Sequence, residues 1–259
     1  IISIIFLTSL LGVEYFYLGF SMQGVFIFLI TMISSTILVE RYEKIKDFGM
    51  LFFITGMLTN FFDFLTVPMV TYAIPLTLYF LLKRRENNEL NAKKIIIDII
   101  KYGALWGIGY SATWFTKWAL TDILFGKNII STALMQVSYR SNGYKTYNVL
   151  KVIGRNMIYI ISQLLVNVII TILLAKLYEI IKMKKVEKIS ITNKEIFIAI
   201  LPYILISIMP FIWYALLQNH SYYHAFFTYR NLILTSLGIC LCLEETLTLQ
   251  FKTKGDIEK

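Results

Sequence analysis

Apolar runs close to the length of a membrane span recur along the chain, and short polar segments separate them. A helix needs about 20 apolar residues to cross the hydrocarbon core of a bilayer. We therefore expect an all-α protein, a polytopic integral membrane helix bundle with about seven to eight spans. In chain order the apolar runs are Ile1–Leu11, Phe16–Val39, Phe48–Phe64, Val67–Leu82, Ile95–Phe125, Val149–Ile181, Ile196–Leu217 and Leu232–Leu243.

The sequence contains no internal repeat, so residues 1–259 are interpreted as a single transmembrane domain. The chain opens inside the apolar run Ile1–Leu11 and not on a methionine. This predicts that the sequence is the C-terminal part of a longer protein.

The stretch Phe48–Leu82 is apolar but too long for one span, and Asn60, Asp63 and Pro68 interrupt it. We therefore predict two short spans with a tight turn between them. The basic residues agree with this, because cytoplasmic loops retain Lys and Arg. With two crossings, the segments on one side hold seventeen Lys and Arg and those on the other side hold six.

This bias predicts a multi-pass protein of the plasma membrane. Its basic segments, among them Lys83–Lys94 as a solvated loop, would face the cytoplasm. The two longest polar segments on the other side, Gly126–Tyr147 and Asn219–Arg230, are predicted to be outer loops.

Composition supports a membrane protein. The chain is 57% hydrophobic and only 16% charged, whereas soluble domains carry about 25% charged residues. The net charge of +9 follows from cytoplasmic loops, so membrane lipid is an expected partner and nucleic acid is not. Cys240 and Cys242 lie two apart in one apolar run and point to different faces, which favours small buried hydrophobes over a disulfide.

The polar residues predicted to lie outside suit the binding of sugars and phosphates. Aromatic rings can stack, carboxylates and amides can hold hydroxyl groups, and a guanidinium can grip a phosphate with two hydrogen bonds. The segment Asn219–Arg230 contains both histidines of the protein. The candidate substrate-binding residues are Asp63, Lys117, Arg140, His220, Tyr222, His224 and Arg230.

Each candidate also has a purely structural interpretation. Asp63 could cap the following helix, Arg230 could extend to lipid headgroups, and Lys117 and Tyr222 fit an interfacial belt. His220 and His224 would share a helix face, but a two-histidine metal site needs a third ligand and no nearby carboxylate is evident. The sequence therefore identifies no metal site and no cofactor, although a divalent cation is compatible with it.

Signatures of soluble enzymes are missing from the sequence, including a glycine-rich phosphate loop, a Gly-x-Ser-x-Gly elbow and a His-Glu-x-x-His zinc motif. Three segments carry a different resemblance: Thr59–Pro68, Thr113–Trp118 and Asn219–Arg230. In their order along the chain they resemble uncharacterised bacterial membrane proteins, encoded with polysaccharide genes, of the GT-C glycosyltransferase superfamily type.

The resemblance implies a membrane glycosyltransferase that takes a sugar from a polyprenyl-phosphate donor at the outer membrane face. The acceptor would be a glycan or glycolipid, in the assembly of surface polysaccharide or glycolipid. That superfamily typically places an acidic catalytic residue in its first outer loop. This chain is expected to begin after that point, so the catalytic base is left unassigned and Asp63 does not take its role.

Two other functions remain open. A transporter or flippase of lipid-linked glycans would favour charged or broken helices at mid-membrane and an internal repeat. A non-catalytic membrane scaffold predicts that the outer polar residues do not converge on one cavity.

Overall fold

The computed structural model describes residues 21–63, 65–85, 91–126, 128–143, 147–161, 173, 177, 187–188 and 192–252. Helices dominate these residues, which confirms the expected helical class, and one antiparallel pair of two-residue strands joins residues 187–188 to residues 251–252. In chain order the elements are α2 (Ser21–Arg41), α3 (Gly49–Phe62), α4 (Pro68–Arg85), α5 (Ala92–Phe125), α6 (Ile129–Ser141), α7 (Val149–Ile161), β1 (Glu187–Lys188), α9 (Asn193–Leu216), α10 (Gln218–Tyr223), α11 (Ala225–Thr228), the 3-10 helix η2 (Tyr229–Leu232), α12 (Ile233–Gln250) and β2 (Phe251–Lys252).

Three helical segments of the described residues are long and apolar enough to cross a membrane: Gly24–Arg41, Asn193–Leu216 and Ala225–Leu249. This supports a membrane-associated protein, but it is fewer than the seven to eight spans expected from the sequence. Helix α3 is apolar yet has only 14 residues. The expected span at Ile1–Leu11 lies outside the described residues, as does most of the run after Ile161.

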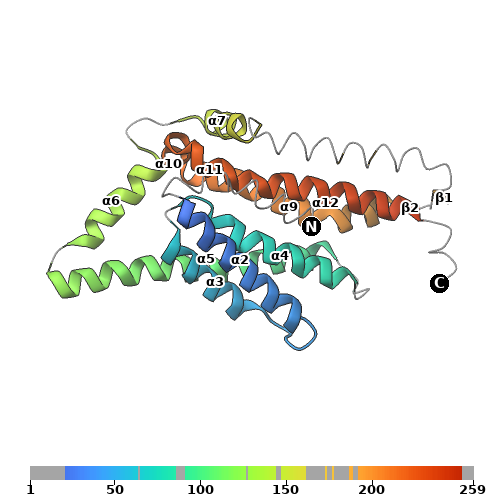
Figure 1. Ribbon diagram of the computed structural model, residues 1–259, viewed down its shortest axis with the longest axis horizontal. Coiled ribbons are helices and arrows are strands. Elements are labelled where there is room, and N and C mark those ends of the chain that lie inside the picture. Colours follow the sequence, from blue (N-terminus) through green and yellow to red (C-terminus); the bar gives the residue numbers. More distant parts are fainter. Residues whose placement is uncertain are drawn as a thin grey trace.

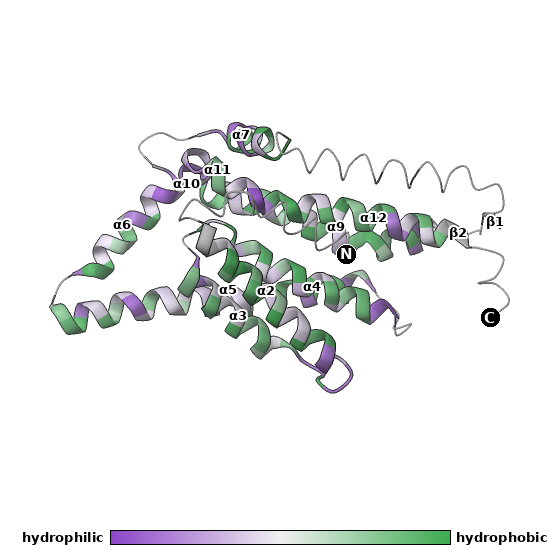
Figure 2. Cartoon of the chain, viewed as in Figure 1, coloured by the Kyte–Doolittle hydropathy of each residue, from purple (hydrophilic) through white to green (hydrophobic). Residues whose placement is uncertain are grey.

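The helices turn at two separate ends of the molecule (Figure 1). One end, which we call the charged end, contains the C-termini of α2, α4 and α12 and the N-termini of α3, α5 and α9. The other, which we call the turn end, contains the α3–α4 turn together with α10, α11 and η2. Hydrophobic residues follow the middle of the helices, whereas the α2–α3 loop and α10 are hydrophilic (Figure 2).

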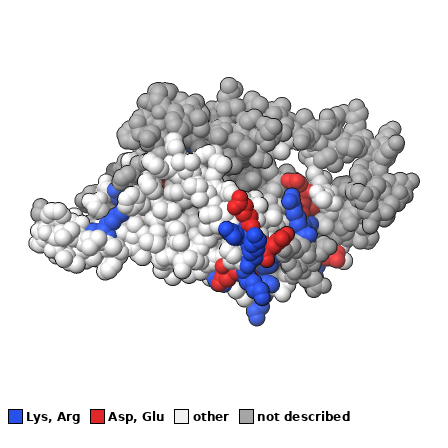
Figure 3. All heavy atoms as spheres, turned by 60° about the horizontal axis from the view of Figure 1, so that its bottom comes forward, with Lys and Arg blue, Asp and Glu red and all other residues white. Residues whose placement is uncertain are grey.

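Three ion pairs give the charged end its name, and each joins two different parts of the chain. Lys83 pairs with Asp98, Arg84 with Glu245, and Lys101 with Asp47. Most of the charged side chains on the face shown in Figure 3 gather over one region, and a broad uncharged area separates them from a few basic side chains. The segregation of charge fits the sequence-based grouping of the basic segments at one end.

Lys83 corrects one expectation. The segment Lys83–Lys94 was predicted to be a solvated loop, but α4 continues to Arg85 and α5 begins at Ala92. The Lys83 side chain is buried, and its ammonium donates to both the Asp98 carboxylate and the Tyr79 hydroxyl. A charge run at the end of a helix can therefore be partly internal when another helix supplies a carboxylate.

Helices α3 and α5 pack with their backbones in very close contact because glycine lies at both crossing points. A Cβ atom on Gly56 would lie 2.0 Å from the Trp106 carbonyl oxygen, and one on Gly109 would lie 2.1 Å from the Phe53 carbonyl oxygen. Small residues at helix crossings allow such close approach in membrane bundles. The α3–α4 pair confirms the predicted tight turn between two helices, although neither helix is among the three segments that could cross a membrane.

A short chain of hydrogen bonds runs through the interior between α3, α4 and α5. The hydroxyl groups of Thr59 and Thr71 lie 2.7 Å apart, and the Trp106 indole N–H donates to the Thr71 hydroxyl at 3.1 Å. All three side chains are buried. Because buried polar groups need partners, these bonds fix how the three helices are rotated against one another.

The two predicted outer loops are largely helical, so their prediction as loops was wrong. Residues 129–141 of the first form α6, and the second forms α10, α11 and η2. The Asp122 carboxylate, at the end of α5, accepts hydrogen bonds from the Ile129 and Ile130 amides, and Asn128 caps Ser131. These bonds satisfy the amide groups that a new helix leaves free at its N-terminus.

Candidate functional site

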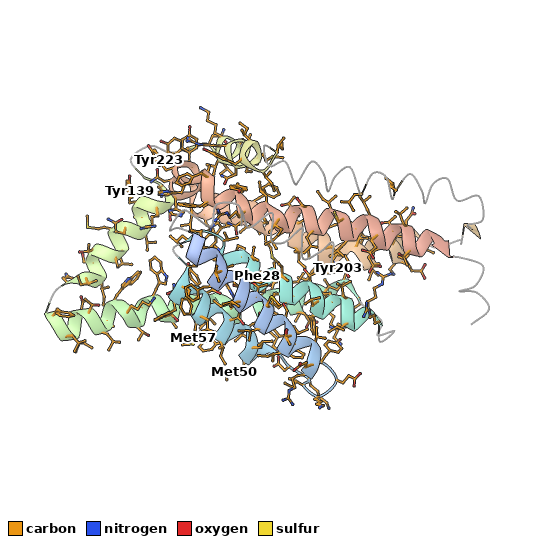
Figure 4. All side chains as sticks on the ribbon, in the orientation of Figure 1. Phe28, Met50, Met57, Tyr139, Tyr203 and Tyr223 are labelled. Atoms are coloured by element: carbon orange, nitrogen blue, oxygen red, sulfur yellow. The ribbon has the colours of Figure 1, made fainter. Side chains whose placement is uncertain are left out.

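A pocket of about 300 Å³ opens at the turn end, between α6 and α10. Helix α6 returns from the far end of α5 and places its C-terminus beside α10, where Tyr139 and Tyr223 lie close together (Figure 4). Arg140, His220 and His224, three of the predicted candidates, line this pocket. Of the described residues, those that line it are Gln136, Tyr139, Arg140, Asn219, His220, Tyr223 and His224.

The two walls of the pocket are held together by Asn219. Its amide Nδ2 donates to the Tyr139 carbonyl oxygen at 2.9 Å, and its side chain is buried. After α6 the chain turns at Gly143, whose φ of 62° is favourable for glycine. A Cβ atom there would lie 2.5 Å from the Asn219 side chain, so glycine also allows this close contact.

Arg140 and His220 meet inside the pocket, although 80 residues separate them. His220 Nε2 lies 3.2 Å from the Leu65 carbonyl oxygen, which can only accept, so Nε2 carries the proton. In the neutral ring Nδ1 is then an acceptor, and it lies 3.5 Å from Arg140 Nη1. The ring of His224 lies 4.7 Å from that of His220, centroid to centroid.

Asp63 does not line the pocket but stabilises the α3–α4 turn, which contacts a pocket residue. Its carboxylate accepts hydrogen bonds from the backbone amide of Thr66, at 3.0 and 3.1 Å, and from the Thr66 hydroxyl. These bonds close the α3–α4 turn, in which Leu65 adopts a φ of 65°. Because the Leu65 carbonyl holds His220, Asp63 orients the turn that fixes a pocket histidine.

Asn231 ties the same turn to the start of the last helix. Its Nδ2 donates to the Thr66 carbonyl oxygen at 3.0 Å and to the Thr228 carbonyl oxygen at 3.2 Å. The α3–α4 turn is therefore held both by α10, through His220, and by η2.

Asn156, which is fully buried in α7, binds the segment that carries the histidines. Its Nδ2 donates to the Ser221 carbonyl oxygen at 3.1 Å, and its Oδ1 accepts from the Thr228 hydroxyl at 2.7 Å. One side chain thus connects α7 to both α10 and α11.

Tyr222 belongs to an aromatic cluster beside the pocket. Its ring stacks on Tyr147 with centroids 4.0 Å apart, and the guanidinium of Arg155 lies 4.5 Å from its centroid. The Tyr147 hydroxyl donates to the Tyr223 hydroxyl at 2.7 Å. The cluster therefore fixes Tyr223, which does line the pocket.

Two predicted candidates lie apart from the pocket. Arg230 is buried in η2 with 6% of its surface exposed, its guanidinium lies 5.9 Å from the Tyr229 ring, and its Nε has no hydrogen-bond partner among the described residues. Such burial differs from the exposed position that a headgroup anchor would take. Lys117 is exposed on α5, and its ammonium lies 4.6 Å from the Phe61 ring centroid.

Four lining residues were not among the candidate residues, although all lie in the two polar segments predicted to be outside: Gln136, Tyr139, Asn219 and Tyr223. Gln136, Tyr139 and Arg140 have the i, i+3, i+4 spacing of one helix face, which would have grouped them had α6 been recognised as a helix. Among the described residues no group of three His, Cys, Asp or Glu side chains could hold a metal ion.

Burial shifts the pKa values of the polar groups around the α3–α4 turn in opposite directions. Burial raises the pKa of Asp63 to about 6, against the lowering effect of its hydrogen bonds to Thr66. Burial lowers the pKa of His220 to about 4, and the nearby His224 and Arg140 lower it further. Burial also lowers the pKa of His224. Both histidines are therefore neutral at pH 7.

These two shifts predict opposing pH dependences of stability. In the folded protein Asp63 holds its proton up to about pH 6, whereas a carboxyl with the ordinary pKa of 3.8 loses its proton at lower pH. The contribution of Asp63 to the free energy of unfolding therefore falls as the pH rises from 3.8 to about 6. His220 binds a proton below pH 6.5 in the unfolded chain but only below about pH 4 in the folded protein. Its contribution to the free energy of unfolding therefore rises with pH between these values. Between pH 4 and 6 the stability of Asp63→Asn should rise more steeply than that of the wild type. The stability of His220→Gln should fall over the same range.

The slopes can be read from unfolding midpoints in detergent at several pH values. Between pH 4 and 6 the change in the free energy of unfolding should differ from that of the wild type by roughly 2 kcal/mol in each variant, since one pKa unit corresponds to about 1.4 kcal/mol. Equal slopes in both variants and the wild type would show that neither group titrates differently in the folded state.

No family model, curated protein or solved structure matches the chain, so the assignment of a function rests on the geometry of the Arg140–His220–His224 pocket.

Proposed function

We propose that this pocket binds the phosphate-bearing headgroup of a polyprenyl-linked sugar, and that the chain is a membrane glycosyltransferase of the GT-C type using that donor. The observation that supports the proposal most is the convergence of Arg140, His220 and His224 on one pocket. A non-catalytic scaffold gives no reason for these outer residues to converge.

The pocket suits a phosphate for electrostatic reasons. Among the described residues no carboxylate lines the pocket, and none forms an ion pair with Arg140. A guanidinium without an acidic partner attracts an anion and can bind two phosphate oxygens at once. Neutral histidines beside it offer a ring N–H or a lone pair to the remaining oxygens and hydroxyl groups.

The position of the pocket suits a lipid-linked donor. It lies at the turn end of the helices, at the opposite end from the three ion pairs. The seventeen-to-six distribution of Lys and Arg favours an outer location for the turn end, with about seven to eight spans in the plasma membrane. A donor whose tail stays in the bilayer would present its phosphate at this level.

In such a reaction the bond between sugar C1 and the phosphate oxygen breaks, and a new bond forms between C1 and an acceptor hydroxyl. The lipid phosphate leaves with the electron pair, and the hydroxyl proton must be taken up by a base. Arg140 would stabilise the charge on the leaving phosphate, as preorganised cations do in group transfer. The pocket lining contains no carboxylate, so we assign donor binding and not proton removal to these residues.

A flippase would favour a helix that is broken at mid-membrane. Helix α9 instead remains helical from Asn193 to Leu216, although it contains Pro202 and Pro210. This observation favours the transferase over the transporter.

Binding of decaprenyl phosphate to the purified protein in detergent tests the proposal, with neutral decaprenol as the comparison lipid. The wild type should bind the phosphate and discriminate against the alcohol. Arg140→Ala should weaken phosphate binding by roughly 10- to 100-fold, because a charge-assisted hydrogen bond contributes about 1.5–3 kcal/mol. Arg140→Lys should recover only part of this, since an ammonium cannot form the paired contact.

Lys151→Ala is the matched control, because Lys151 is an exposed cation near the same end, on α7, and does not line the pocket. It should bind decaprenyl phosphate as the wild type does. Equal affinity for the phosphate and the alcohol, or unchanged binding in Arg140→Ala, would overturn the proposal.

A further inference from the structure

Two exposed tyrosines line the pocket that contains Arg140. Tyr139 on α6 is 42% exposed and Tyr223 on α10 is 52% exposed, and both belong to the lining. Figure 4 shows them at the same end of the molecule, one on each helix. Large exposed rings are common at membrane interfaces, so their exposure alone does not indicate a ligand.

What distinguishes these residues is that the Tyr223 ring and the Tyr139 backbone are both held in place at the pocket. The Tyr223 hydroxyl accepts a hydrogen bond from Tyr147 at 2.7 Å, and Tyr147 and Tyr222 each meet its ring edge to face, with interplanar angles of 87°. The backbone of Tyr139 is fixed by the hydrogen bond from Asn219. Rings that are already ordered lose little conformational entropy when a ligand stacks on them.

From this arrangement we infer that Tyr139 and Tyr223 form a clamp for a single hexose ring attached to the phosphate held by Arg140. This inference rests on the proposed function and adds the site of the donor sugar. A pyranose has an apolar face of C–H groups that can pack on an aromatic face, while its hydroxyl groups bond to polar neighbours. Gln136 and His224 lie in the same lining and provide an amide and an imidazole for those hydroxyl groups.

The size of the pocket limits the ligand. Its volume of about 300 Å³ is at the lower end of small-ligand pockets, which range over about 300–1,000 Å³. It therefore suits one sugar ring with its phosphate and not an oligosaccharide chain.

The test compares two probes on the purified protein: decaprenyl phosphate, and decaprenyl phosphate carrying glucose, mannose or galactose. The wild type should bind at least one of the sugar-bearing lipids about tenfold more tightly than the bare phosphate. In Tyr223→Ala the affinity for the sugar-bearing lipid should fall to that for bare decaprenyl phosphate, so that the preference is lost. Tyr223→Phe keeps the ring and should keep most of the preference.

Phe226→Ala is the matched control, because Phe226 is a comparably exposed ring (46%) on the neighbouring helix α11 and lies outside the pocket lining. It should retain the sugar preference. A wild type that binds decaprenyl phosphate but no sugar-bearing lipid more tightly would overturn the clamp and leave the proposed function intact. Equal loss of both probes in Tyr223→Ala would show a structural tyrosine. A wild type that binds neither probe would overturn the proposed function and the clamp together.

Discussion

Replacing Lys83 with methionine should lower the free energy of unfolding by about 3–5 kcal/mol. The side chains of Lys83 and Asp98 are only 6% and 14% exposed, and the Tyr79 hydroxyl donates to the same carboxylate oxygen. Removing one charge leaves the other without its counter-ion in a poorly solvated position. Most of the loss therefore reflects the stranded carboxylate and not the attraction itself.

The double variant Lys83→Met/Asp98→Asn separates these two contributions. Both charges are then absent, and the asparagine oxygen can still accept from Tyr79. We expect it to be more stable than Lys83→Met alone, by about 2 kcal/mol, because residues that share one interaction are not additive. A double variant no more stable than Lys83→Met would contradict the importance of the stranded charge.

The molecule contains its own control in the exposed pair Lys101–Asp47, whose side chains are 45% and 56% exposed at an N–O distance of 2.8 Å. Lys101→Met should cost less than about 1 kcal/mol, because solvent screens exposed pairs. Unfolding midpoints measured in the same detergent for both sets of variants give the comparison directly.

Replacing Gly109 with alanine should destabilise the protein by about 3 kcal/mol, near the upper end for overpacking of a core. The new methyl group would lie 2.1 Å from the Phe53 carbonyl oxygen and 3.2 Å from the Met57 amide nitrogen. Backbone atoms cannot move aside as the tip of a flexible side chain can, so α3 and α5 would have to separate.

Gly107→Ala, two residues earlier on α5, is the control because nothing lies within 4 Å of its added Cβ atom. Alanine is the better helix former by about 1 kcal/mol, so this variant should match or exceed the wild type in stability. Thermal unfolding followed by size-exclusion chromatography would rank the three proteins. A Gly109→Ala protein as stable as Gly107→Ala would mean that the two helices do not pack this closely.

The sequence was sufficient for features that depend on local pattern. Asn60, Asp63 and Pro68 interrupt one apolar stretch, and the interruption predicted the α3–α4 hairpin. The uneven distribution of basic residues along the chain also placed Arg140 and the two histidines on the same predicted side of the membrane. These predictions needed only the hydropathy and the charge of residues along the chain.

Features that depend on distant contacts were not predictable in this way. Helix α6 has only 13 residues, and its first amides bond to Asp122 at the end of the preceding helix. Arg230 is closer to His220 in sequence than Arg140 is, yet the Asn219 contact with Tyr139 brings Arg140 to the pocket. Local spacing contains no information about such a pairing.

The hydrogen bonds of Asn156 have a mechanical consequence. In Figure 1 α7 is seen nearly end on, whereas α9 and α12 lie along the view plane, so α7 crosses the bundle at the turn end. Its outward side chains, including Leu150 and Ile158, are exposed and apolar. Because Asn156 donates to the Ser221 carbonyl oxygen, next to His220, we expect a displacement of α7 to change the position of His220 in the pocket.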